Sequence, residues 1–188
     1  MRKIFFLILC IIGLGASLFP QSPREGTKGI PQRVSTAFTA AGVPVLREPV
    51  PLIDFDLPLL DGTTRNTRDL RGKVLFLNFW ATWCGPCRAE MPSMETLYRR
   101  FKNQGLEFLA VNLQESRKVV SAFMDQLGLS FPAALDQQGS VGAAYGVMAI
   151  PTTYIVDREG RIIARVTGSL NWDNPKLFSA FDTLLSSP

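Results

Sequence analysis

A buried-strand pattern that runs directly into a pair of cysteines and then into a helix constrains the fold of this chain most. Residues 74–80 (VLFLNFW) have the length and the β-branched or aromatic content of a buried strand. Cys84-Gly85-Pro86-Cys87 follows, and the proline suits a helix start because the N–H that it lacks would have no intrahelical partner. We therefore predict a strand, a tight turn and a helix that begins at the cysteine pair.

The two cysteines are spaced for reversible redox chemistry. Side chains three positions apart in a helical turn lie roughly 5–6 Å apart at Cβ, which is close enough for a disulfide after small adjustments. The N-terminus of a helix also carries about half an elementary positive charge, which favours a thiolate over a thiol. Cys84 and Cys87 are therefore predicted to form a dithiol/disulfide couple.

The predicted helix has one apolar face, and a glutamate falls on it. This face comprises Cys87, Met91, Met94, Leu97, Tyr98 and Phe101. Mostly off it lie the charged residues Arg88, Glu95, Arg99 and Lys102. Glu90 lies on the apolar face, where desolvation would raise its pKa and allow proton exchange with the inner thiol. The other interpretation is a partly exposed glutamate whose stem covers apolar surface.

Composition excludes several kinds of site. The chain has no histidine, so neither Ser-His-Asp nor Cys-His catalysis is available. Arg88 after the second cysteine rules out the Cys-x-x-Cys-His pattern of haem attachment. The third cysteine, Cys10, lies in an apolar run, so the second half of a zinc site is missing and we expect neither a metal nor a cofactor besides the cysteine pair. The net charge of +4 comes from scattered basic residues, so nucleic-acid binding is not expected.

The chain begins with a short positive segment and an apolar run. Arg2 and Lys3 precede an apolar stretch that ends at Phe19 and totals about 16 residues, just under the ≈ 17–25 of a membrane-spanning helix. Residues 1–19 are therefore either a signal peptide or an N-terminal membrane anchor, and both interpretations stay open. Either way the remainder is expected outside the cytoplasm, in the periplasm or at the outer face of the cytoplasmic membrane.

The rest of the chain divides into a linker and one domain. Residues 20–50 contain several prolines, glycines and hydroxyl residues without an apolar period, which predicts a flexible linker. Residues 51–187 alternate strand and helix patterns and form the globular domain. Its expected elements are a hairpin over 53–67, strands at 74–80 and 106–113, a helix capped by Ser116, a hairpin of 152–156 with 161–167, and a last helix begun by Asn174 and Pro175.

These elements predict an α/β fold. A central mixed β-sheet should be flanked by helices, with an N-terminal β-hairpin extension.

Several motifs give the chain a family resemblance. They are LRGKVLFLNFWATWCGPCRAEMP at 70–92, AVNLQES at 110–116, IPTTYIVDREG at 150–160 and VTG at 166–168. Together they resemble the exported TlpA/ResA-type thiol–disulfide oxidoreductases of the thioredoxin superfamily, over roughly residues 51–185. The resemblance implies a thioredoxin-like fold and is specific, because a tryptophan-flanked Cys-Gly-Pro-Cys is combined with Ile-Pro-Thr about 65 residues later.

The resemblance also implies roles for individual residues. Cys84 would be the exposed nucleophile and Cys87 the buried thiol that resolves a mixed disulfide. Pro151 would be a cis-proline beside the pair, along which a substrate backbone could lie, and an ordinary trans-proline at a strand start is the other interpretation. Trp83 would shield one side of the active surface, unless it only packs in the core. The implied substrate-binding residues are Trp83, Gly85, Pro86, Ile150 and Pro151.

Two positions distinguish this chain within the superfamily. Asn78 stands where thioredoxin has a buried acid that moves protons for the inner cysteine, and an asparagine does not titrate. Glu90 occupies the place of a glutamate that the ResA-like group has after its second cysteine. The resemblance and the helical pattern therefore both select Glu90 as a third catalytic residue.

The resemblance implies an enzyme that reduces disulfides in partner proteins, and we expect the chain to be monomeric. An apocytochrome c is one candidate substrate, as in cytochrome c biogenesis, and a membrane dithiol carrier would resupply electrons. Two other functions stay open. One is peroxide reduction on a thioredoxin fold, which usually needs a Thr-x-x-Cys site with an arginine. The other is a non-catalytic binding module in which the cysteines form a structural disulfide.

Overall fold

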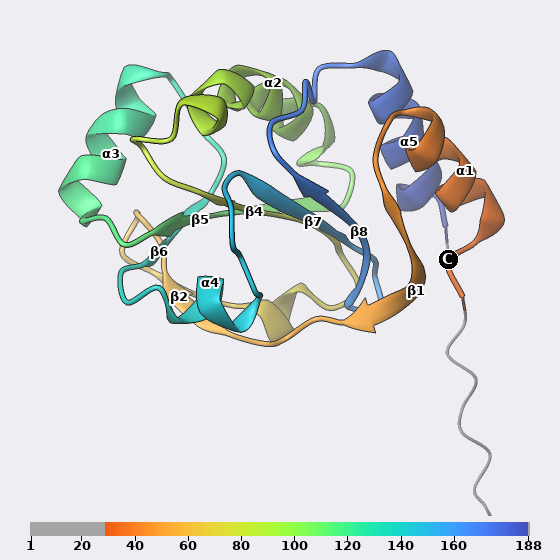
Figure 1. Cartoon of the computed structure of the whole chain (residues 1–188), viewed down its shortest axis with the longest axis horizontal. Coiled ribbons are helices and arrows are strands. Elements are labelled where there is room, and N and C mark those ends of the chain that lie inside the picture. Colours follow the sequence, from red (N-terminus) through yellow and green to blue (C-terminus); the bar gives the residue numbers. More distant parts are fainter. Residues whose placement is uncertain (1–28, 188) are drawn as a thin grey trace, which may run out of the picture.

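The computed structural model describes residues 29–187. Its centre is a six-stranded mixed sheet (Figure 1). The strand order is β1-β8-β7-β4-β5-β6. The strands are β1 (Val45–Pro51), β4 (Val74–Trp80), β5 (Leu106–Leu113), β6 (Ala133–Asp136), β7 (Thr152–Val156) and β8 (Arg161–Thr167). β4, β5 and β6 run parallel, whereas β7, β8 and β1 each run antiparallel to their neighbours. The predicted thioredoxin-like α/β fold with a mixed sheet is confirmed.

Helices cover both faces of this sheet unequally. The helices are α1 (Gln32–Ala40), α2 (Gly85–Phe101), α3 (Arg117–Gln126), α4 (Ser140–Ala144), α5 (Pro175–Leu185) and the 3-10 turn η1 (Thr67–Leu70). α1, α2, α3 and α5 pack on one face, and α4 lies on the other, near the hairpin of β2 (Asp56–Pro58) and β3 (Thr64–Asn66) (Figure 1). The predicted N-terminal hairpin is therefore present, although its strands are shorter than expected.

Burial on both faces explains the largely apolar sequence of the central strand β4. All seven of its residues are buried. Phe76 and Trp80 contribute to the core under α2, and Leu75, Leu77 and Phe79 contribute to the core on the opposite face. A strand covered on both faces favours apolar residues at nearly every position instead of every second one, and the exception here is Asn78, whose buried amide is hydrogen-bonded to Glu90 and Thr153.

The domain begins earlier than the sequence suggested. β1 pairs with β8 at the edge of the sheet, and α1 packs on α5 with the rings of Phe38 and Phe181 at 5.2 Å. The prediction of a flexible linker over residues 20–50 is therefore wrong for residues 32–50. α1 escaped notice because only Val34 and Phe38 are buried along it, too few for a clear helical period.

One prediction concerns the N-terminal segment that precedes the described residues. The signal peptide or anchor at residues 1–19 lies outside the described residues 29–187. Between residues 29 and 187, none of the helices has the length and apolar character needed to cross a bilayer.

One charged side chain of α2 is placed differently from the prediction. Glu95 was expected off the apolar face, but it is buried. Its carboxylate accepts hydrogen bonds from the backbone N–H of Ser130, at 2.8 Å, and from the hydroxyl of the same residue. Because these bonds replace water, the side chain can be buried without losing its hydrogen-bond partners.

Candidate active site

The two cysteines form a disulfide at the N-terminus of α2. Their Cα atoms are 5.2 Å apart. Cys84 is the N-cap of the helix, and its Sγ accepts a hydrogen bond from the backbone N–H of Cys87 at 3.2 Å. Cys84 is only 5% exposed, much less than the exposed nucleophile that the resemblance implied, because the segment around Ile150 covers it. Cys87 is fully buried, so of the two cysteines only Cys84 has surface that a partner can contact. This asymmetry fits the roles of outer nucleophile and inner resolving thiol.

A second segment, 66 residues further along the chain, meets the disulfide. The peptide bond between Ile150 and Pro151 is cis, as the family resemblance predicted. The carbonyl oxygen of Ile150 lies 3.7 Å from Cys84 Sγ. Thr152 holds this segment from within, because its hydroxyl donates to the carbonyl of Ala149 at 2.7 Å. The sequence motifs around residues 84 and 150 are therefore brought together at one place.

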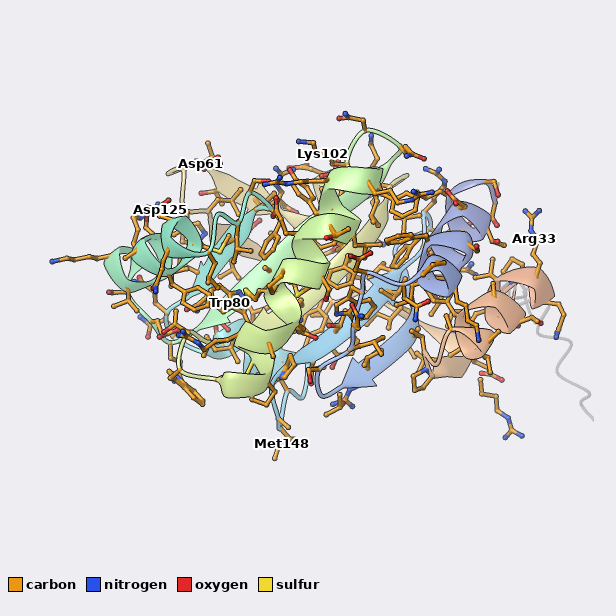
Figure 2. All side chains as sticks on the ribbon, turned by 90° about the horizontal axis from the view of Figure 1, so that it is seen from above. Arg33, Asp61, Trp80, Lys102, Asp125 and Met148 are labelled. Atoms are coloured by element: carbon orange, nitrogen blue, oxygen red, sulfur yellow. A yellow bond between two sulfur atoms is a disulfide. The ribbon has the colours of Figure 1, made fainter. Side chains whose placement is uncertain are left out.

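The surface around the disulfide is apolar and open. Trp83 is 73% exposed and Met148 is 92% exposed. Figure 2 shows the Met148 side chain pointing away from the body of the molecule. A groove of about 230 Å³ runs between them, lined by Trp83, Leu113, Gln114, Val147, Met148, Ala149 and Ile150. The interpretation of Trp83 as a core residue is wrong, and exposed apolar side chains beside a reactive group are typical of a docking surface.

The dipeptide between the cysteines is exposed next to the bond. A Cβ atom added to Gly85 would meet no other atom within 4 Å, so steric space does not require glycine there. Pro86 lies in the first turn of α2, where its missing N–H costs nothing.

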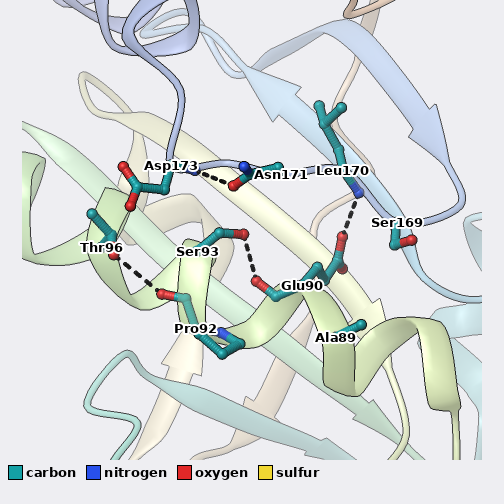
Figure 3. Close-up of a pocket in the computed structure, with 9 residues that line it drawn as sticks. All are labelled: Ala89, Glu90, Pro92, Ser93, Thr96, Ser169, Leu170, Asn171 and Asp173. Atoms are coloured by element: carbon teal, nitrogen blue, oxygen red, sulfur yellow. Dashed lines mark hydrogen bonds between the residues drawn. The ribbon is translucent and has the colours of Figure 1, made fainter.

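Glu90 is buried on the inner face of α2 and fully hydrogen-bonded. It is only 2% exposed. Its Oε1 accepts from Asn78 Nδ2 at 3.1 Å, and its Oε2 accepts from the backbone N–H of Leu170 at 3.1 Å and from Trp172 Nε1 at 3.2 Å. Figure 3 shows the carboxylate facing Leu170. The interpretation of Glu90 as a partly exposed side chain is therefore wrong.

This environment tunes the carboxyl group to neutral pH. Burial raises the pKa of Glu90 from 4.5 to about 7, while the three hydrogen bonds act in the opposite direction. A general acid or base is most effective when its pKa lies near the working pH. Glu90 follows Cys87 by three positions on the same helix, so it can hold or release a proton one turn from the inner sulfur.

A groove of about 450 Å³ adjoins this carboxyl group, between α2 and the loop after β8 (Figure 3). It is lined by Ala89, Glu90, Pro92, Ser93, Thr96, Ser169, Leu170, Asn171 and Asp173. Glu90 lines this groove but is only 2% exposed, so solvent in the groove contacts only a small part of its surface.

Sequence reasoning did not single out three residues of this site. Leu170 and Trp172 contact Glu90 from 80 and 82 positions away, and no local pattern marks such pairs. Met148 was also missed, although its place just before the Ile-Pro-Thr motif was a usable signal. Within residues 29–187, no three His, Cys, Asp or Glu side chains are grouped to hold a metal ion.

Comparisons with known proteins agree with this geometry. The model of the AhpC/TSA family matches residues 48–165. The thiol-disulfide oxidoreductase ResA of Geobacillus thermodenitrificans strain NG80-2 is 44% identical over 123 residues, which cover 65% of this chain and 71% of the relative.

Solved structures show the same fold. A thiol:disulfide interchange protein of the thioredoxin family from Chlorobium tepidum TLS superimposes with a TM-score of 0.64 at 25% identity, covering 74% of this chain and 98% of that one. A secreted thiol-disulfide isomerase from Corynebacterium glutamicum gives 0.62 at 26% identity, covering 71% and 83%. Three findings agree: the matched family model, the curated relatives, and a Cys-x-x-Cys disulfide beside a cis-proline. The chain therefore belongs to the AhpC/TSA family, as a ResA-like thiol–disulfide oxidoreductase of thioredoxin-like fold.

Proposed function

We propose that this chain reduces disulfides in partner proteins outside the cytoplasm. The observation that carries this proposal is the disulfide between Cys84, which is 5% exposed, and the fully buried Cys87, beside an exposed apolar surface. A structural disulfide has no need of that surface. The docking groove between Trp83 and Met148 gives a partner polypeptide apolar contacts next to the outer sulfur.

The reaction transfers two electrons in two exchange steps. In the reduced enzyme the Cys84 thiolate attacks one sulfur of a partner disulfide, a mixed disulfide forms, and the other partner sulfur leaves as a thiolate. The Cys87 thiolate then attacks Cys84 Sγ, which restores the enzyme disulfide and releases the second partner sulfur. The partner gains two electrons and two protons. We propose that Glu90 accepts the proton of the Cys87 thiol as that group becomes the nucleophile, and its burial and its pKa of about 7 support this role.

The enzyme must then be reduced again. A dithiol carrier in the membrane could supply two electrons through the same exchange at Cys84. We propose that the N-terminal segment directs the chain to the periplasm or to the outer face of the cytoplasmic membrane, as a signal peptide or a single-span anchor. Relatives named ResA, and a secreted isomerase among the solved structures, support an extracytoplasmic site of action.

The proposed substrate class includes apocytochrome c. Its haem-attachment cysteines form a Cys-x-x-Cys-His disulfide that must be reduced before haem can be linked. The support is the likeness to ResA proteins and an open docking groove beside Cys84, and the chain is proposed to act as a monomer.

The test is insulin reduction with dithiothreitol as electron donor. We expect faster insulin precipitation with the wild-type protein than with Cys84→Ala. Consumption of hydrogen peroxide without insulin reduction would instead favour a peroxide reductase. If the protein shows neither activity, the remaining interpretation is a binding module with a structural disulfide. The reduction potential separates directions of transfer, because a value well below about −200 mV favours a reductase and one near −120 mV an oxidase.

A further inference from the structure

The turn that presents Trp83 and Cys84 is held by a residue outside the site described so far. The backbone N–H of Cys84 donates to the carbonyl of Ala81 at 3.2 Å, so residues 81–84 form a tight turn between β4 and α2. Thr82 and Trp83 occupy the two central positions of this turn. Anything that fixes Thr82 therefore fixes its neighbour, the exposed indole.

Glu115 makes that contact. Its carboxylate accepts from the backbone N–H of Thr82 at 2.7 Å and from the Thr82 hydroxyl at 2.5 Å. The same carboxylate accepts from Asn112 Nδ2 at 2.7 Å, and Asn112 is fully buried on the neighbouring strand. The carbonyl of Thr82 in turn accepts from Arg88 Nη1 at 3.2 Å. All three polar groups of Thr82 are therefore held by named partners.

The residue before Glu115 has an unusual backbone conformation that directs the chain toward β4. Gln114 has φ +60°, and among residues 29–187 it is the one non-glycine with positive φ. Its N–H donates to the carbonyl of Asp136 at 3.0 Å, which holds it in place. A left-handed residue that is not glycine costs about 1 kcal/mol or more and persists where its surroundings hold it. The chain leaves β5 through this residue and turns Glu115 toward β4.

We propose that Glu115 is a positioning residue that sets the spacing between the Trp83 indole and the Cys84 sulfur for a docking partner. It touches neither sulfur, and the inference rests on the proposed reduction of partner proteins for its kinetic consequence. Cys84 Sγ is held independently by the N–H of Cys87. Loosening the turn should therefore weaken partner docking and leave the intrinsic reactivity of the sulfur unchanged.

The chain contains a matched control for this idea. The Glu95 carboxylate accepts from both the backbone N–H and the hydroxyl of Ser130, as the Glu115 carboxylate does from Thr82. The further partner of Glu95 is Arg99, at 2.5 Å, where Glu115 has Asn112. Its partner lies in the loop before β6, outside the disulfide turn. If Glu115 only closes a loop, the variants Glu115→Ala and Glu95→Ala should behave alike.

The experiment compares these two variants on the reduced full-length protein. For Glu115→Ala we expect the kcat/KM for insulin to fall about threefold to tenfold through a higher KM, because the partner meets a Trp83 that is no longer fixed; the effect is about the size of one net hydrogen bond. The rate with the small disulfide 5,5′-dithiobis(2-nitrobenzoate) should stay within about twofold of wild type. Glu95→Ala should lose comparable stability in urea and keep both rates. Equal effects of the two variants on insulin, or an equal fall with the small disulfide, would overturn the proposal.

A second pair of variants keeps the test independent of folding problems at Glu115. Thr82→Ser retains the hydroxyl and should match the wild-type KM, whereas Thr82→Ala loses one contact and should raise it. Backbone ¹⁵N relaxation adds a readout that needs no substrate. In Glu115→Ala the order parameter of Trp83 should fall from about 0.85 toward 0.6, and in Glu95→Ala it should not. If the wild-type protein fails to reduce insulin, the proposed function is wrong. The relaxation data still test the positioning role of Glu115, because an unchanged order parameter of Trp83 in Glu115→Ala would reject it.

Discussion

The indole Nε1 of Trp172 donates a hydrogen bond to Oε2 of Glu90 at 3.2 Å. This bond joins the segment before α5 to the inner face of α2, one turn beyond Cys87. Trp172 is fully buried, and its backbone N–H also donates to Ser93 Oγ at 3.0 Å. The carboxyl group of Glu90 is therefore held by a residue 82 positions away in sequence, which connects the segment before α5 to the inner face of α2.

Glu90 should make the stability of the oxidised protein depend on pH. Its folded pKa of about 7 lies above the ordinary 4.5, so between these values the folded protein keeps a proton that the unfolded chain releases. The contribution of Glu90 to the free energy of unfolding should therefore be largest below about pH 4.5 and fall by about 3 kcal/mol as pH rises to 7 and beyond. Urea unfolding of wild type and Glu90→Gln across this range measures the difference.

The matched variant for this titration is Trp172→Phe. The indole hydrogen bond lowers the pKa of Glu90, so its removal should move the midpoint of the stability loss to higher pH. Superimposable pH curves for wild type and Glu90→Gln would contradict the assignment of a near-neutral pKa to this side chain.

Glu90 should also shape the ionisation of the thiols in the reduced protein. Above about pH 7 its negative charge lies one helical turn from Cys87, and a like charge disfavours thiolate formation. In Glu90→Gln we expect the thiol pKa to fall by about half a unit to one unit. The rate of iodoacetamide alkylation as a function of pH checks this. Identical profiles in both proteins would remove Glu90 from the proton-transfer step.

The two cysteines should differ in mixed-disulfide trapping. Cys87→Ala retains the outer sulfur and lacks the resolving thiol, so it should accumulate a covalent complex with an oxidised protein substrate. Cys84→Ala retains only the buried sulfur and should trap none. Non-reducing electrophoresis after mixing with oxidised insulin reads out both. Equal trapping through either cysteine would show that the assigned roles are wrong.

Trp83 should contribute to partner docking and little to folding. Because it is 73% exposed, Trp83→Ala should change the free energy of unfolding by no more than about 0.5 kcal/mol. The KM for insulin should rise about threefold to tenfold, since exposed aromatic side chains dominate docking energies. Val50→Ala, which removes an exposed apolar side chain from the edge strand β1, is the control and should leave KM unchanged. A normal KM in the Trp83 variant would exclude the indole from docking.

Local patterns predicted the disulfide and the burial of Glu90. The apolar run of β4, the proline inside α2 and the apolar face of that helix are properties of neighbouring residues, and they led to the disulfide and to a buried Glu90. The cis peptide at Pro151 came from the family resemblance, because no local pattern reveals its contact with a cysteine 66 positions away.

The predictions failed where burial depends on distant partners. Glu95 looked like a surface residue because its helical position is off the apolar face, yet Ser130 satisfies its carboxylate in the interior. Glu115 lies within the AVNLQES motif, but no local pattern predicted its contact with Thr82, since that contact depends on where the chain leaves β5 beside the turn after β4. α1 is helical without a wide apolar face, because α5 covers only one narrow strip of it.

The pairing of β1 with β8 has a practical consequence for working with this protein. A shortened chain that starts after β1 would leave the backbone amide and carbonyl groups along the outer edge of β8 without partners. Exposed edge strands of this kind pair with other chains and cause aggregation. Recombinant protein intended for enzymology should therefore start upstream of Gln32, where α1 begins.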